Sequence, residues 1–216
     1  MAYSDITDPS EYFQVATYTG NGNATNAITN DGNSDLQPDF VWVKRRDGAS
    51  DHVLQDSTRG FTTTTKLSTS SDQHENDTDS GGSFGVTDPQ WGYVSSASSD
   101  GFNANVGTGT GDQVNKTSST YVAWQWKAAG STTASNSVGD ISSTVQANTT
   151  AGFSIVTYTG TGSAGTIAHG LGATPTVYII KNRERSDSWR VAAEVLGYGD
   201  QLLLNDTDAE ANDNNT

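Results

Sequence analysis

The chain contains one sequence pattern twice, and this repetition restricts its possible folds more than any other feature. The matching pairs occur in the same order and are residues 13–22 with 153–162, 38–46 with 175–183 and, more weakly, 67–72 with 203–208. The spacing falls from 140 to 137 to 136 residues, so the second copy is slightly shorter between the matches. Because short deletions are tolerated in loops, we interpret the chain as two copies of one structural unit.

The repeat divides the 216 residues into four parts. Residues 13–127 form a first unit and residues 151–216 a second, truncated unit, with residues 1–12 as an N-terminal arm. Residues 128–150 are mostly Ser, Thr, Ala, Gly and Asn, so we expect a flexible or extended linker there.

The second unit lacks a counterpart of residues 84–127. A sheet without its last strands has unpaired edge groups and an uncovered apolar face. We therefore expect the polypeptide to continue beyond Thr216, with the alternative that another chain supplies the missing strands. The polar tail 205–216 is expected to be a frayed end.

Five segments have the composition of short β-strands, because they are rich in Val, Ile, Thr and aromatic residues and end at Gly, Asn, Asp or Pro. These segments are residues 13–18, 40–44, 121–127, 153–158 and 176–181. In the third, a period of two places Val122, Trp124 and Trp126 on one face, which we expect to meet the core. No helical period extends over ten residues. The predicted fold is all-β, with repeated jelly-roll or lectin-like β-sandwich modules of which the second is incomplete.

Charge and composition exclude several classes of protein. The chain has 25 acidic and 11 basic residues and a net charge of −14, which disfavours nucleic acid as a partner. No apolar run approaches the roughly 18 residues that cross a bilayer, and the first residues lack the features of a secretory signal, so no membrane insertion is expected. Cysteine is absent, which excludes disulfides and thiolate chemistry.

No motif identifies a catalytic, cofactor or metal site. The acidic loop 77–82 has alternating carboxylates like a calcium loop, but Gly81 stands where a fifth ligand belongs, so a solvated loop is the better interpretation. The nucleophile elbow and the dinucleotide-binding glycine motif are absent. His52, His74 and His169 have no ligand spacing, and His52 aligns with Trp189, which favours a packing role.

Two basic clusters follow the matching strands, at residues 44–46 and 181–185. Their repetition favours local salt bridges, with Asp47 and Asp51 in the first unit and Glu184 and Asp187 in the second.

Tryptophan is the residue type most suited to stacking on sugar rings. Trp42 and Trp124 lie in strong strand patterns and are expected in the core. Trp91 lies among turn residues, is the tryptophan expected to be most exposed, and is the candidate for glycan stacking.

As a set, six segments resemble repeat modules of tail fibres and virion structural proteins of tailed bacteriophages, especially those of marine cyanobacteria. The segments are YTGNG at 18–22, PDFVWVK at 38–44, DSTRG at 56–60, SDGF at 99–102, TYVAWQWKA at 120–128 and GFSIVTYTG at 152–160. The resemblance implies lectin-type β-sandwiches in a long, trimeric, cysteine-free protein that is made in the host cytoplasm and resides in the virion tail.

By this resemblance, the chain is expected to be the tail-attached start of a fibre that spaces and anchors a distal receptor-binding region, without enzymatic activity. The N-terminal arm would dock onto a tail adaptor or nozzle protein through Tyr3, Ile6, Pro9 and Tyr12. Host surface glycan would bind to regions beyond this chain. Three alternatives remain open: a carbohydrate-binding adhesin module, a capsid decoration protein and a depolymerase.

Overall fold

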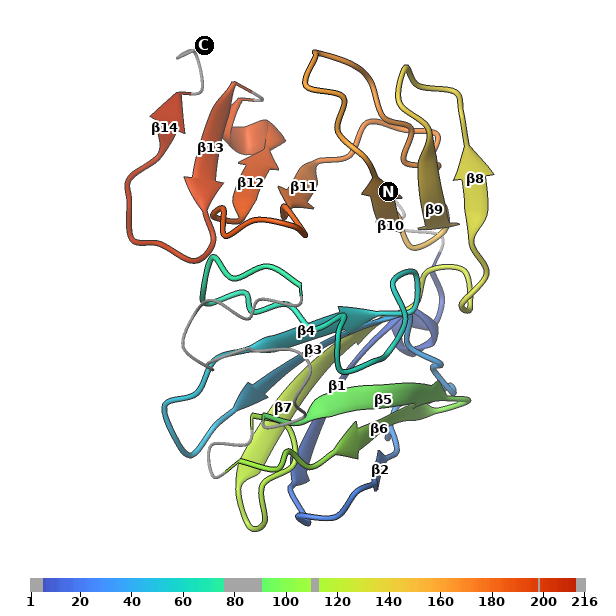
Figure 1. Ribbon diagram of the computed structural model, residues 1–216. Helices are drawn as coiled ribbons and strands as arrows, with labels where there is room; N and C mark the ends of the chain where they lie inside the picture. The colour runs from blue at the N-terminus through green and yellow to red at the C-terminus, as the bar shows by residue number, and fades with distance from the viewer. Residues whose placement is uncertain (1–5, 76–90, 110–112, 198, 213–216) are drawn as a thin grey trace.

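The computed structural model describes residues 6–75, 91–109, 113–197 and 199–212, and these residues form antiparallel β-sheets (Figure 1). The described part of the chain contains two 3₁₀ turns, η1 (Pro9–Glu11) and η2 (Glu194–Leu196), and no α-helix. None of its helices is long and apolar enough to cross a membrane. The predicted all-β, sandwich-type class is confirmed, and each of the five predicted strands is present.

The first unit is a sandwich of two sheets, which occupies the lower half of Figure 1. The larger sheet has the strand order β1 (Phe13–Thr19), β7 (Thr120–Trp126), β3 (Phe40–Arg45), β4 (Val53–Asp56). The smaller sheet has the order β2 (Asn26–Ile28), β6 (Gly101–Asn105), β5 (Tyr93–Ser98). Side chains from both sheets pack in one core, which includes Ala16, Val41, Val43, Tyr121 and Ala123 on one side and Ile28, Val94, Phe102 and Ala104 on the other.

The core face of β7 is the opposite of the predicted one. Tyr121, Ala123 and Gln125 are buried between the sheets, whereas the face with Val122, Trp124 and Trp126 is half-buried on the outside. Ala123 is fully buried in the core between the sheets, and the Gln125 side-chain nitrogen donates to Asn30 Oδ1 at 2.6 Å. The alternation of the two faces of β7 was therefore predicted correctly, but the face with more apolar residues was wrongly predicted to be the core face.

The second half of the chain forms two further small sheets, in the upper half of Figure 1. One has the order β10 (Phe153–Tyr158), β9 (Ser143–Asn148), β8 (Ala134–Asn136). The other has the order β11 (Val177–Ile180), β12 (Arg190–Ala193), β13 (Asp200–Leu203), β14 (Ala211–Asn212).

Within residues 128–150, which were expected to form a flexible or extended linker, the chain forms β8 and β9, and β9 pairs along the whole of β10. Low apolar content did not prevent strand formation there, since Val145 and Gln146 are buried against other parts of the chain.

One hairpin occurs twice with the same register. In the first unit Val41 lies opposite Gln55, and in the second Tyr178 lies opposite Ala192, which are the positions 137 residues further on. The correspondence holds for all four residue pairs of each hairpin. The duplication of the whole unit stays a prediction, because β10 pairs with β9 and no described strand joins β10 to β11.

The two ends of the described chain are packed, contrary to expectation. Asp8 caps η1 and accepts a hydrogen bond from the Ser34 hydroxyl at 2.8 Å, so residues 6–12 fold back onto the first unit instead of extending. In the tail, Asn205 Oδ1 accepts the Trp189 N–H at 2.7 Å and β14 pairs with β13, so residues 205–212 are not frayed.

Candidate functional site

Aromatic side chains cover the outside of the larger sheet of the first unit. Because register sets cross-strand neighbours, Phe13, Trp126 and Phe40 form one row across β1, β7 and β3. The ring centroids in this row are 4.8 and 5.3 Å apart. The next row contains Trp124 and Trp42, whose ring centroids are 5.8 Å apart. We call these five residues the aromatic face.

The second unit covers part of the aromatic face. Phe153, at the start of β10, lies with its ring centroid 5.8 Å from that of Phe40 and 6.1 Å from that of Trp126. The β1 side remains open, since Phe13 and the neighbouring Val15 are 38% and 43% exposed. The sheet therefore presents a partly exposed apolar and aromatic strip beside the joint between the two units.

His52 lies at the end of the aromatic face. The Trp42 indole N–H donates to His52 Nδ1 at 2.9 Å, which requires this nitrogen to be unprotonated. Burial lowers the pKa of His52, and the nearby Lys44 lowers it further, so the neutral ring is favoured. His52 fixes the orientation of Trp42, which agrees with the packing role predicted for it.

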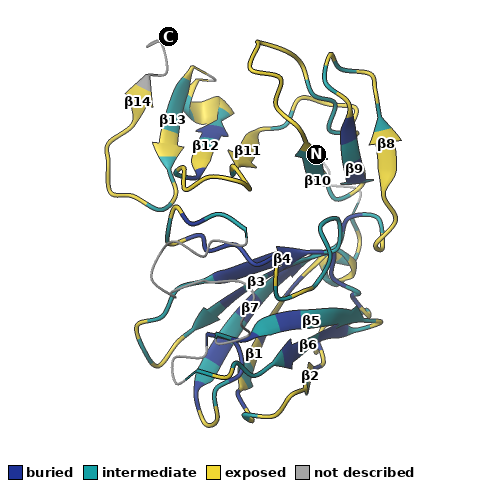
Figure 2. Cartoon of the chain, viewed as in Figure 1, coloured by how far each residue is buried: buried dark blue, intermediate teal, exposed yellow. Residues whose placement is uncertain are grey.

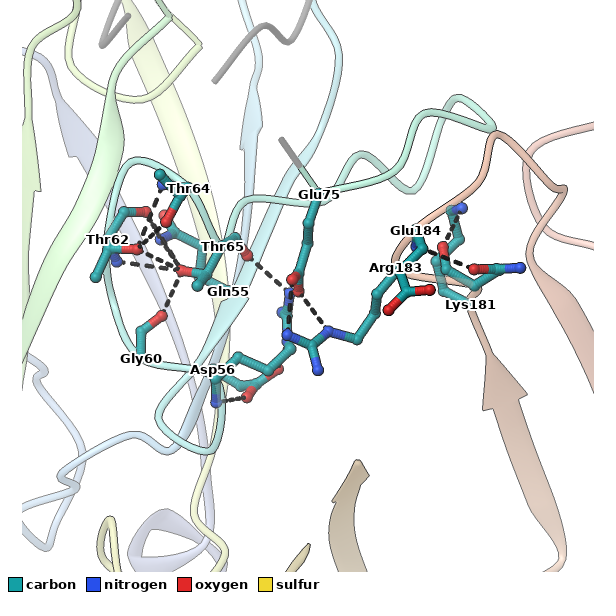
Figure 3. Close-up of polar contacts among 12 residues, drawn as sticks. Gln55, Asp56, Gly60, Thr62, Thr64, Thr65, Glu75, Lys181, Arg183 and Glu184 are labelled. Atoms are coloured by element: carbon teal, nitrogen blue, oxygen red, sulfur yellow. Dashed lines mark hydrogen bonds and ion pairs between the residues drawn. The ribbon is translucent and has the colours of Figure 1, made fainter. Parts of the chain in front are cut away.

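Four charged side chains join the two units, and we call them the arginine clamp: Asp56, Arg59, Glu75 and Arg183. Arg59 Nε donates to Asp56 at 2.6 Å, and its Nη1 donates to Glu75. Figure 3 shows Arg183 reaching from the second unit to Glu75, where its Nη2 lies 2.7 Å from Oε2. The Arg59 and Asp56 side chains are each only 4% exposed, so the clamp has a buried centre and a partly exposed outer member.

Glu75 is held as a carboxylate between the two arginines. Burial raises the pKa of Glu75, but the hydrogen bond from Arg183 and the charge of Arg59 outweigh burial and lower the pKa below its ordinary value of 4.5. The hydrogen bond with Glu75 raises the pKa of Arg183, although burial acts in the opposite direction. The Glu75–Arg183 pair is thus ionised at neutral pH.

Uncharged contacts continue the joint on both sides of the clamp. Trp189 is 5% exposed, packs against Leu54 and Leu67, and donates its indole N–H to the Ser68 carbonyl at 2.7 Å. Gln146 is fully buried and donates from Nε2 to the hydroxyls of Ser57 and Thr58, at 2.8 and 3.0 Å. Trp189 thus holds the second unit on the first, and Gln146 holds β9, with which β10 of the second unit pairs.

The predicted site residues do not come together in one site in the structure. Pro9 is exposed, and Ile6 and Tyr12 are half-buried, whereas Tyr3 and the acidic loop 77–82 lie outside the described residues. Trp91 is half-buried rather than conspicuously exposed, and its carbonyl accepts the Gln113 N–H at 2.9 Å. The expectation of a core position for Trp42 and Trp124 was wrong, because both lie on the aromatic face.

Local salt bridging was predicted correctly for one basic cluster. Arg45 Nε lies 2.7 Å from Asp47, as expected at that strand end. In the second cluster, Arg183 pairs with Glu75 in the first unit and not with its acidic neighbours. Nothing in the sequence could have identified a pair separated by 108 residues, although Arg59 does lie in one of the six segments that carry the family resemblance.

The described residues include no group of three or more His, Asp or Glu side chains that could hold a metal ion. The candidate site is therefore the joint between the two β units, with its ion pairs and buried contacts, and the neighbouring aromatic face.

Comparison with known proteins identified one family. A family model described as a domain of unknown function (DUF7483) matches residues 8–216. Neither the search of curated proteins nor the search of solved structures found a match.

Proposed function

The chain belongs to the DUF7483 family, and we propose that it is a non-enzymatic structural protein of a bacteriophage virion, in the tail-attached part of a tail fibre. In this role, it spaces and anchors a distal region that binds the host receptor. The assignment to a tail fibre comes from the sequence resemblance.

The joint between the units is the observation that supports a mechanical role. A spacer must transmit force between its modules without bending freely, and flexible linkers cannot do so. Here the arginine clamp and the buried Trp189 connect the units through side chains, while β8 and β9 occupy the stretch between them and Gln146 of β9 bonds to the first unit. Such a joint favours a load-bearing module over a pair of independently moving domains.

The proposed partners follow from the same role. The exposed Pro9 and the half-buried Ile6 and Tyr12 give the N-terminal arm a small apolar surface for a tail adaptor or nozzle protein. A homotrimer is the assembly expected for a fibre, and host glycan would bind to other regions of the assembled fibre.

The location in the particle tests this proposal. Antibodies raised against residues 1–216 should label the tail in electron micrographs of particles of the phage that encodes the chain. Label on the capsid would support the capsid decoration alternative, and particles without label would overturn a virion role.

The aromatic face favours a second candidate, a module that binds host surface polysaccharide. Apolar ring faces stack on the CH groups of sugars, and Trp124 and Trp126 lie beside the exposed Phe13 and Val15. A glycan array of the purified chain should then show binding that Trp124→Ala removes, whereas loss only in Trp91→Ala would place the binding at Trp91, the candidate from the sequence. Release of oligosaccharides from the array would instead indicate a depolymerase.

A further inference from the structure

A pocket of about 450 Å³ lies on the sheet β11–β14, which is at the upper left of Figure 1. Its lining comes from β12, β13 and β14 and from the segments that directly precede β12 and β14, so every lining residue belongs to the second unit. Pockets that hold small ligands in proteins measure roughly 300 to 1,000 Å³. The pocket is therefore large enough for a small molecule or for one part of a polymer.

The floor of the pocket follows from the strand register. Arg190 of β12 lies opposite Leu203 of β13, and Gln201 of β13 lies opposite Ala211 of β14. Because Gln201 and Leu203 are two residues apart on one strand, these four side chains share one face of the sheet. The floor thus offers a guanidinium and an amide beside apolar groups.

Hydrogen bonds hold the two segments beside the floor together. Asn205, on the connection between β13 and β14, donates from Nδ2 to the Ser188 hydroxyl at 3.3 Å and accepts the Trp189 N–H at 2.7 Å. Ser188 and the preceding Asp187 line the pocket from one segment, and Asp208 lines it from the other. The two carboxylates are thus carried by segments that are fastened to each other.

The charged groups of the pocket are not paired with one another. In the part of the chain that the structure describes, no carboxylate lies within ion-pair distance of Arg190, and the side chains of Arg190, Gln201 and Asp208 make no hydrogen bond. Asp187 uses one oxygen, which accepts from Asn182 Nδ2 at 2.8 Å. Donors and acceptors of hydrogen bonds therefore line one pocket with their capacity left for a ligand.

We propose that this pocket binds a sugar unit of a neutral polysaccharide. Hydroxyl groups both donate and accept hydrogen bonds, so neighbouring hydroxyls of one ring can bond to the carboxylates and to Arg190 together. The CH groups of the same ring would pack on Leu203 and Ala211, which supply the apolar part of the floor. The pocket is separate from the aromatic face, which belongs to the first unit.

Other classes of ligand match the pocket less well. Two carboxylates, Asp187 and Asp208, repel an anionic ligand. A metal ion would need further ligands, and none of the described residues adds a third His, Asp or Glu to this pair. The inference does not rest on the tail-fibre proposal, which places the receptor-binding region elsewhere.

An array of neutral, acidic and amino-sugar oligosaccharides tests the pocket with the full chain. The wild type should bind neutral members, and Asp208→Asn should bind them about tenfold more weakly, because a hydroxyl loses a charged acceptor. Asp206→Asn is the matched control, since it makes the same change of charge on the same connection but outside the pocket lining, and it should keep the wild-type affinity.

A second variant fills the pocket without removing a polar group. Ala209→Trp places an indole among the lining residues and should abolish binding, while circular dichroism establishes that the variant folds. No binding of neutral members, equal affinities in the two Asp variants, or binding that requires added calcium would each overturn the proposal. Binding that only Trp124→Ala removes would also overturn it and would support the aromatic face instead. Unlabelled phage tails beside pocket-dependent binding would overturn the tail-fibre role alone.

Discussion

Buried polar side chains connect separate segments of this protein through hydrogen bonds. Asp39 is fully buried, and its carboxylate accepts backbone N–H groups of Ala128 and Gly130 at 2.7 and 2.8 Å, which fixes the chain where it leaves β7. Gln55 is also buried and connects the two sheets of the sandwich, because its Oε1 accepts the Val94 N–H at 2.8 Å. Such groups stabilise the fold only when every partner is present, so their removal leaves unsatisfied donors in the interior.

Glu75→Gln should lower the free energy of unfolding by about 2 kcal/mol at neutral pH, because the buried Arg59 loses a charged partner but keeps Asp56. Denaturant unfolding measures this loss. Asp47→Asn is the matched control, since it breaks a more exposed pair with Arg45 and should lower the free energy of unfolding much less. Equal losses in the two variants would show that the clamp is no stronger than a surface salt bridge.

The contribution of Glu75 should depend on pH with a defined sign. Its pKa in the folded protein is lower than the ordinary 4.5, so the folded state binds the proton more weakly than the unfolded state. The stability that it provides is complete above about pH 5 and is lost as the pH falls below 4.5 through the folded pKa. The difference between the wild type and Glu75→Gln should shrink over that range, and a difference that grows on acidification would contradict the ionised clamp.

The β5–β6 hairpin depends on a backbone conformation that favours glycine. The β5–β6 hairpin closes with Ser98 opposite Gly101, which has a φ of +108°. A Cβ on Gly101 would lie 2.0 Å from the Ile28 carbonyl oxygen, so the close approach of the hairpin to β2 also requires glycine. The glycine of the SDGF segment at 99–102 is therefore required by the geometry of this hairpin.

Gly101→Ala should lower the free energy of unfolding by about 3 kcal/mol, from backbone strain and the clash with β2. Gly152→Ala is the control, because Gly152 has a φ of +67° but no heavy atom within 4 Å of an added Cβ, and it should cost only about 1 kcal/mol. Thermal unfolding compares the two variants, and similar losses would show that strain alone, without the clash, determines the cost.

Strand β12 is attached to the first unit through Trp189, which directly precedes it. Trp189→Ala should cost about 3 to 5 kcal/mol, because it creates a cavity against Leu54 and Leu67 and removes the hydrogen bond to Ser68. Trp124→Ala, on the half-buried aromatic face, should cost about half as much. Chemical denaturation gives both values, and a loss under about 1 kcal/mol for Trp189→Ala would contradict its role as an anchor.

At the scale of the whole molecule, the second unit has little core of its own. Its described strands are mostly exposed or half-buried, whereas those of the first unit contain fully buried side chains (Figure 2). Its most buried aromatic residue, Trp189, belongs to a cluster with first-unit residues. The second unit is therefore stabilised mainly by packing against the surface of the first unit.

Heating should unfold the chain in a single cooperative transition, because the second unit cannot persist without the first. Differential scanning calorimetry should show one peak for the wild type. In the double variant Glu75→Gln/Trp189→Ala, an earlier, smaller transition should separate from the main one. Two peaks in the wild type would show that the units are independent domains.

The sequence alone determined five of the strands, since β-rich segments bounded by turn residues keep that structure wherever they pack. The repeated segments 38–46 and 175–183 begin two hairpins of the same register, which local pattern and turn length set. Only the tertiary structure decided which face of β7 is the core, that residues 128–150 supply two strands, and that Glu75 meets Arg183. The physical reason is that either face of a strand can be buried, and a charged side chain can pair with any of several opposite charges. Contacts with distant parts of the chain decide which face is buried and which pair forms.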